Sequence, residues 1–155
     1  MLFTLKRKLY IKRTNIMTIN NTTITKGFII AGLMNTTVLI FSKFFTNTVI
    51  NEADPVVMSN FGLLMILIWG LAYMSIAKNY SKVKWLVGVF AIATFIYGCI
   101  WINWVLTNTI SNVFEKDLMA GAFFAIYGVN DWLFFIFFTT VFIRLLKEKT
   151  HLLKN

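Results

Sequence analysis

Four long apolar segments alternate with shorter polar segments along this chain of 155 residues. The apolar segments cover residues 27–45, 61–77, 85–106 and 118–143. A bilayer core of ~30 Å takes about 20 apolar residues in helical conformation. None of the four segments shows the sustained period-two alternation that indicates a strand. The sequence therefore predicts an all-α polytopic membrane protein with four transmembrane helices in a bundle.

The polar segments differ in charge according to their position. The segment before the first apolar stretch, the one between the second and third, and the one after the fourth hold all but two of the 15 Lys and Arg residues. Because an excess of Lys and Arg marks cytoplasmic segments, we expect both termini to be cytoplasmic. The chain then divides into a basic cytoplasmic N-terminal segment (1–26), a transmembrane domain (27–143) and a basic cytoplasmic tail (144–155).

The composition supports a membrane location and narrows the partners. Hydrophobic residues make up 58% of the chain and charged residues 14%, against about 45–50% and about 25% in soluble domains. The net charge of +9 follows from the topology, so nucleic acid is not an expected partner. Expected partners are the lipid bilayer, anionic lipid headgroups at the basic termini, and a protein subunit or second copy. The expected location is the bacterial inner (plasma) membrane as a multi-pass protein, with an organellar membrane as the alternative; a start at Met1 or at Met17 stays open.

Two ionisable residues fall inside the apolar segments, where such residues mark functional sites by default. Asp131 lies near the middle of the fourth segment, and Lys43 lies toward the outer end of the first. One interpretation pairs the two charges at the floor of an outward-opening cavity. In the other, Lys43 extends to the outer interface, while Asp131 is protonated and hydrogen-bonded to a neighbouring helix.

Aromatic and amide side chains accompany Asp131 at helical spacing. A deeply placed indole N–H or phenol O–H needs a hydrogen-bond partner, which Asp131 and Asn35 offer. Two interpretations remain: a polar core satisfied internally, or a ligand cavity with aromatic walls. The candidate ligand-binding residues are Asp131, Asn130, Tyr127, Tyr97, Trp101, Trp69, Tyr73, Asn35 and Lys43.

Other chemistry has little support in the sequence. With one His (His151) and one Cys (Cys99), the chain offers no haem-ligand pair, no CxxC and no metal motif. We predict no cofactor, no metal site and no catalytic residue, and we expect Cys99 to be a buried structural thiol. The Phe-rich run 133–142 is expected to face lipid or a partner subunit.

Two functions follow from these observations. The first is a non-catalytic integral membrane protein, not an enzyme, that serves as an accessory or scaffold subunit of a membrane assembly. The alternative is a binder or carrier of a small-molecule or lipid-like ligand in the cavity around Asp131.

Two stretches, Asp54–Tyr80 and Glu115–Asp131, carry a resemblance. Over residues 27–143 the chain resembles small four-span membrane proteins of bacteria. The resemblance implies four spans and brings no activity with it.

Overall fold

The computed structural model describes residues 21–152, and within that range all regular elements are helices. Side chains are described as far as residue 148. Most of the predicted N-terminal segment (1–26), including Met17, lies outside the described residues, as does the His151 side chain. The helices are α2 (Asn21–Thr36), α3 (Val38–Phe41), α4 (Thr48–Ala53), α5 (Asn60–Ile76), the 3₁₀ helix η1 (Tyr80–Val83), α6 (Lys84–Thr107), α7 (Ile110–Lys116) and α8 (Leu118–Leu152).

Three helical segments are long and apolar enough to cross a membrane. They cover Asn21–Phe41, Tyr80–Thr107 and Leu118–Glu148. The fourth apolar helix, α5, has 17 residues and is shorter. Its bounds and those of α6 differ by one residue at each end from the predicted segments 61–77 and 85–106.

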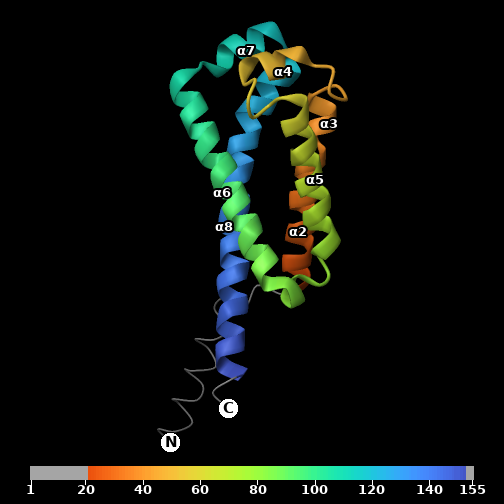
Figure 1. Ribbon diagram of the computed structural model, residues 1–155, viewed down its shortest axis with the longest axis vertical. Coiled ribbons are helices and arrows are strands. Elements are labelled where there is room, and N and C mark those ends of the chain that lie inside the picture. Colours follow the sequence, from red (N-terminus) through yellow and green to blue (C-terminus); the bar gives the residue numbers. More distant parts are fainter. Residues whose placement is uncertain (1–20, 153–155) are drawn as a thin grey trace, which may run out of the picture.

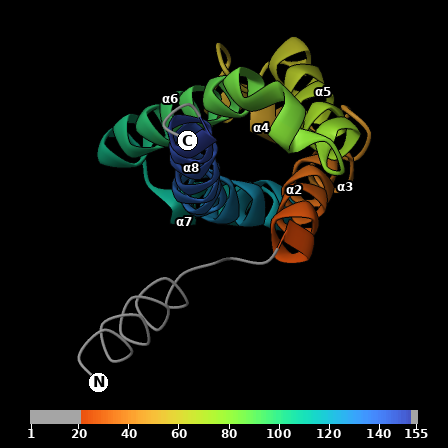
Figure 2. The ribbon, with the colours of Figure 1, turned by 90° about the horizontal axis from the view of Figure 1, so that it is seen from below.

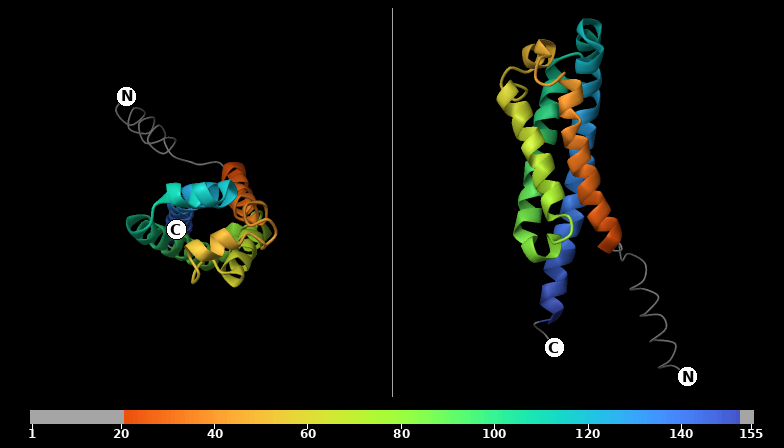
Figure 3. Two further views of the ribbon diagram at one scale, coloured as in Figure 1. Left: turned by 90° about the horizontal axis from the view of Figure 1, so that it is seen from above. Right: turned by 90° about the vertical axis from the view of Figure 1, so that its right-hand side faces the viewer.

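The long helices associate in two antiparallel pairs. α2 and its continuation α3 run along α5, and α6 runs along α8 (Figure 1). Seen along the long axis, the α2–α5 pair lies beside the α6–α8 pair (Figure 2). We call the end with Lys78, Lys82, Lys84 and Arg144 the basic end, and the end with Glu52, Asp54, Glu115 and Asp117 the acidic end. The short helices α4 and α7 lie at the acidic end (Figure 3).

Two glycines allow α2 and α5 to approach closely. A Cβ atom on Gly32 would lie 2.6 Å from the Gly70 carbonyl oxygen, and one on Gly70 would lie 2.8 Å from the Gly32 carbonyl oxygen. Small residues of this kind let helix backbones meet in lipid, where packing replaces the hydrophobic driving force. The close contact also brings Asn35 of α2 against α5, where its Nδ2 donates to the Ile66 carbonyl oxygen at 3.3 Å.

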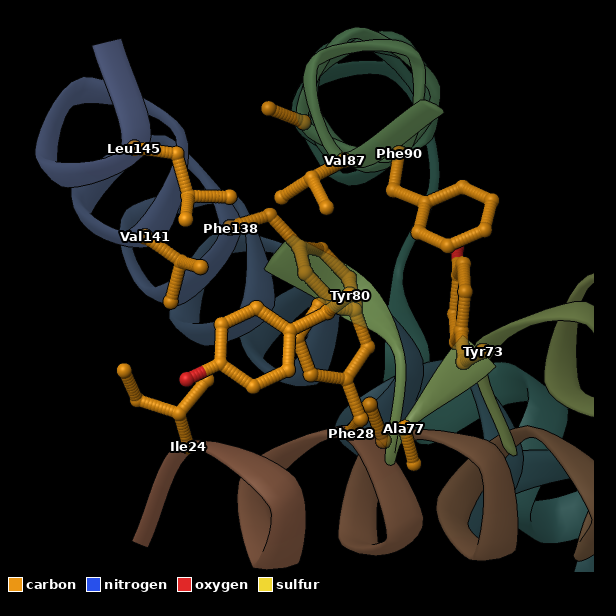
Figure 4. Packing of buried hydrophobic residues seen from close by; sticks show 12 residues of the cluster. Ile24, Phe28, Tyr73, Ala77, Tyr80, Val87, Phe90, Phe138, Val141 and Leu145 are labelled. Atoms are coloured by element: carbon orange, nitrogen blue, oxygen red, sulfur yellow. The ribbon is translucent and has the colours of Figure 1, made fainter. Parts of the chain in front are cut away.

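An aromatic cluster fills the half of the molecule near the basic end (Figure 4). Phe28 is fully buried there, with its ring 5.2 Å from that of Phe138 and 5.5 Å from that of Tyr80. The five phenylalanines of the run 133–142 are all buried or half-buried, whereas Leu133 and Ile136 are exposed. The expectation that this run faces lipid or a partner is therefore wrong for Phe138, which is buried in the core, whereas Phe135 and Phe142 also line a hollow on the α6–α8 pair.

The first apolar segment departs most from the prediction. Its helix starts at Asn21 rather than Gly27 and ends at Phe41 rather than Phe45. The end is set by Lys43, Phe44 and Phe45, whose φ angles of 50°, 56° and 67° place all three in the left-handed region. A non-glycine residue there costs roughly 1–2 kcal/mol, so contacts elsewhere must hold this turn.

Two expectations near the ends of α6 and α8 also change. α8 runs past the predicted end at Ile143 to Leu152, and Leu145 is buried against the aromatic cluster. The extension carries an Arg144–Glu148 ion pair of 2.8 Å at i,i+4 spacing, which favours helix. Cys99 is exposed on α6, not buried as expected.

Candidate functional site

A cavity lies where the two helix pairs face each other. Its volume is about 40 Å³, which is room for a few water molecules. α2, α3, α5, α6 and α8 all contribute to its walls. The lining residues are Met34, Asn35, Thr37, Val38, Phe41, Ile66, Trp69, Tyr73, Tyr97, Phe123, Ile126, Tyr127, Asn130 and Asp131.

Seven of the nine candidate residues from the sequence line this one cavity, although they come from four helices. They are Asn35 from α2, Trp69 and Tyr73 from α5, Tyr97 from α6, and Tyr127, Asn130 and Asp131 from α8. The helical spacing by which these residues were selected therefore identified side chains that share one interior space. Lys43 and Trp101 lie elsewhere.

Asp131 is the only acidic residue among the lining side chains. It lies near the middle of the candidate span Leu118–Glu148. Tyr73, Tyr97 and Tyr127 line the same cavity. Within residues 21–148, no hydrogen bond or ion pair involves the Asp131 side chain. The cavity thus has one carboxyl group and three phenols among its lining residues, and no Lys or Arg.

The aromatic walls are preorganised by contacts among themselves. The rings of Trp69 and Tyr73 stack with centroids 6.5 Å apart, and the Tyr127 ring stacks on Phe123 at 5.2 Å. The Tyr127 hydroxyl is buried and has no hydrogen-bond partner in the described part of the chain. A buried hydroxyl without a partner costs about 1–3 kcal/mol. A hydrogen bond between this hydroxyl and a bound group would remove that cost.

Trp101 serves the helix packing instead of the cavity. Its indole nitrogen donates to the Phe124 carbonyl oxygen at 2.7 Å, and its ring covers Gly128, where a Cβ atom would collide with it. Its inclusion among the cavity residues is therefore wrong. We expected the indole N–H to find a buried acceptor in Asp131 or Asn35. The acceptor is instead a backbone carbonyl of α8.

Lys43 pairs with a different acid from the one considered in the sequence. Its Nζ lies 2.6 Å from Asp117 Oδ2 at the acidic end, outside the candidate spans. The Asp131–Lys43 pair is therefore wrong, because the left-handed turn carries Lys43 out of the first span and toward the start of α8.

Asp117 is the residue that sequence reasoning missed. Its Oδ1 accepts from the Ala120 backbone N–H and from Asn47 Nδ2, both at 2.8 Å. The Lys43 ammonium, the Ala120 N–H and the Asn47 amide together lower the Asp117 pKa from 3.8 to about 2. The sequence does contain a signal for its role as the N-cap of α8, because Asp directly before an apolar helical run is a strong N-cap residue.

The chemically active groups among the lining residues are the Asp131 carboxyl and the tyrosine phenols. Among the described residues, no group of three or more His, Cys, Asp or Glu side chains could hold a metal ion. A single carboxyl with phenols can bind a cation or carry a proton. No protein-family model matches this chain, and no curated protein or solved structure is significantly similar to it.

Proposed function

We propose that this chain is a non-catalytic membrane protein with four spans, both termini cytoplasmic, that binds a small ammonium-type cation in the cavity around Asp131. The observation that carries the proposal is the convergence on one cavity of a carboxyl without a protein cation, three phenols and an indole. The bacterial plasma membrane is the location that we propose with it.

The four-span topology rests on α5 as the fourth span. At 1.5 Å per residue its 17 residues reach ~26 Å, slightly less than the ~30 Å of a bilayer core, and local thinning of the bilayer accommodates such a mismatch. α5 runs antiparallel along α2 (Figure 1), which itself belongs to a membrane-length segment. A spanning α5 also puts the basic residues of the α5–α6 connection on the same side as the C-terminal end of α8, as the positive-inside rule requires.

The choice of a cation follows from the charge of the cavity. An isolated carboxylate in a water-poor site is costly unless it is protonated or paired, and no Lys or Arg lines the cavity. A bound cation supplies the missing charge. Aromatic rings also line the cavity, and a ring face turned to the cation adds cation–π attraction, which reaches about 2 kcal/mol for desolvated groups.

The size of the cavity limits the cation. Pockets for drug-sized ligands measure about 300–1,000 Å³, whereas this cavity measures about 40 Å³. We therefore propose ammonium or a short alkylammonium ion as the ligand. Asn35 and Asn130 also line the cavity, and their amide oxygens are the acceptors that we propose for the N–H groups that the carboxylate leaves free.

The accessory or scaffold role stays a second proposal. Its basis in the sequence was the Phe-rich run as a partner surface, and all five of those phenylalanines are buried or half-buried against the core. Exposed apolar side chains at the acidic end, among them Phe44, Val56 and Phe61, are the remaining support for a partner subunit. Because these are scattered over two connections and the first turn of α5, we place the ligand function first.

The experiment measures ligand-dependent thermal stability of the detergent-purified full chain by tryptophan fluorescence. The probes are ammonium, methylammonium and potassium at constant ionic strength, with N-methylglucamine as the balancing cation. A ligand at ten times its Kd stabilises the folded state by about 1.4 kcal/mol. We expect saturable stabilisation by methylammonium that Asp131→Asn abolishes, Tyr97→Phe weakens and Glu52→Gln, at the exposed acidic end, leaves unchanged. The absence of saturable stabilisation, or equal stabilisation of Asp131→Asn, would refute the proposal.

A further inference from the structure

A hollow in two adjoining parts follows the α6–α8 pair, away from the Asp131 cavity. Its part at the basic end has a volume of about 590 Å³, with Lys82, Lys84, Leu145 and Glu148 in its walls. Its inner part has a volume of about 560 Å³ and lies between α6 and α8. Trp85 belongs to both parts.

The two parts adjoin at Trp85, and we call them together the groove. On α8, the wall residues Phe135, Thr139, Phe142, Leu145 and Glu148 follow at steps of three and four, which is one face of a helix. The ring of Phe142 lies 5.7 Å from that of Trp85, and this contact marks the junction of the two parts.

The groove is basic at one end and apolar along the rest. Two lysines, Lys82 and Lys84, bring positive charge to its mouth. The one acid there, Glu148, is held by Arg144 at 2.8 Å, so its charge is compensated. Beyond Trp85 the walls are Gly88, Ile92, Phe95, Phe135 and Phe142 with few polar atoms.

The length of the groove matches one leaflet. From Trp85 to Phe95 the α6 axis rises ~15 Å, which is about half of the ~30 Å hydrocarbon core. Gly88 lets the Phe142 ring pack closely against α6 at this wall, because a Cβ atom there would lie 3.1 Å from the ring. A charged mouth above an apolar channel one leaflet deep has the dimensions of a phospholipid.

We propose that this groove binds an anionic phospholipid, with its phosphate between Lys82 and Lys84 and one acyl chain along Ile92 and Phe95. Lys84 is placed for this role, because its Nζ lies 5.3 Å from the Trp85 ring centroid at the mouth. The inference uses the proposed topology, which puts the basic end at the cytoplasmic leaflet, where anionic lipids are enriched. It does not depend on the Asp131 ligand.

The test titrates the detergent-purified full chain with phosphatidylglycerol and with phosphatidylcholine of identical acyl chains, and measures bound lipid by native mass spectrometry. We expect phosphatidylglycerol to bind more tightly. Because each basic residue near the surface contributes about 1 kcal/mol, or about a fivefold change, Lys82→Gln/Lys84→Gln should lose about 30-fold in phosphatidylglycerol affinity. Lys78→Gln removes the same charge from the same connection outside the groove and should leave the affinity unchanged.

A second pair of variants tests the acyl channel separately. Ile92→Trp fills the groove and should weaken both lipids equally, leaving their affinity ratio unchanged. Ile96→Trp, on the same helix and similarly exposed but outside the groove, is the matched control. Equal binding by the wild type and the double lysine variant, equal losses in Lys78→Gln, or full binding by Ile92→Trp would each overturn the proposal. Asp131→Asn should keep lipid binding, which separates failure of this site from failure of the cation site.

Discussion

Asp117 has two separable roles at the acidic end, and this makes it the sharpest target for a stability test. Its carboxylate caps α8 through the Ala120 N–H and holds the left-handed turn through Lys43. Asp117→Asn keeps an oxygen for the cap and loses the ion pair, whereas Asp117→Ala loses both. Lys43→Met loses the ion pair alone.

The magnitudes follow from the exposure of the pair. The Lys43 side chain is 51% exposed and that of Asp117 18%, and exposed ion pairs contribute about 0.2–1 kcal/mol. Loss of a cap costs about 1 kcal/mol on average. We expect about 1 kcal/mol for Asp117→Asn or Lys43→Met, and about 2 kcal/mol for Asp117→Ala. At about 2–4 °C per kcal/mol for a chain of this size, the midpoints should fall by about 2–4 °C and 4–8 °C.

The assay is thermal unfolding in detergent, followed by tryptophan fluorescence, for the three single variants and Lys43→Met/Asp117→Asn. Because the two residues contact each other, the double variant should be no less stable than either single variant. Additive losses in the double variant would refute the ion pair, and equal losses in Asp117→Asn and Asp117→Ala would refute the cap.

The same carboxylate predicts a pH dependence. Its pKa is lowered from 3.8 to about 2 in the folded protein, so the folded state favours the ionised form. The stabilisation is then complete above about pH 4 and declines as the pH falls toward 2. Unfolding midpoints of the wild type and Asp117→Asn should converge over that range; a constant difference would contradict the assignment.

Three further predictions concern packing and topology. Gly70→Ala should destabilise the protein by about 1–3 kcal/mol through overpacking, with exposed Ser75→Ala unchanged; equal midpoints would contradict the close helix contact. Single cysteines in a background without Cys99 should react with an impermeant reagent outside intact cells at Asn112→Cys and not at Ser81→Cys, and reaction at Ser81→Cys alone would invert the proposed topology. In the wild type, Cys99 should react with a membrane-permeant maleimide and resist a charged one, because it is exposed within a membrane-length helix; equal reactivity toward both would place it in water.

The ends of helices were predictable at positions where apolar residues give way to charged residues along the chain. Ile76 and Lys84 lie at such changes, and the ends of α5 and α6 fall within one residue of the prediction. The end of the first helix was not predictable, because Lys43, Phe44 and Phe45 include no glycine or proline to indicate a left-handed turn. The contacts that hold it include the bond of Lys43 to Asp117, 74 residues away in sequence, and local bonds from the Phe45 N–H to Ser42 Oγ and from Asn47 Nδ2 to the Phe41 carbonyl oxygen.

The candidate site was predictable for a similar reason. Asp131, Tyr127 and Tyr97 are conspicuous, because polar groups are rare in apolar helices and must face the interior. The apolar part of the wall, including Phe41, Phe123 and Ile126, carried no signal that distinguishes it from lipid-facing residues. Trp101 was assigned wrongly because its position on α6 does not reveal which backbone carbonyl it reaches.

The pairing of the helices has a consequence for biogenesis. Each antiparallel pair consists of helices that are neighbours in sequence, α2 with α5 and α6 with α8, so each can enter the bilayer as a hairpin during synthesis. The Asp131 cavity exists in neither hairpin, since α2, α3 and α5 supply one wall and α6 and α8 the other. Under the proposed function, a ligand in this cavity would contact both halves and stabilise their association. Residues 1–78 and 79–155, synthesised as two polypeptides, should therefore reassemble more completely when methylammonium is present.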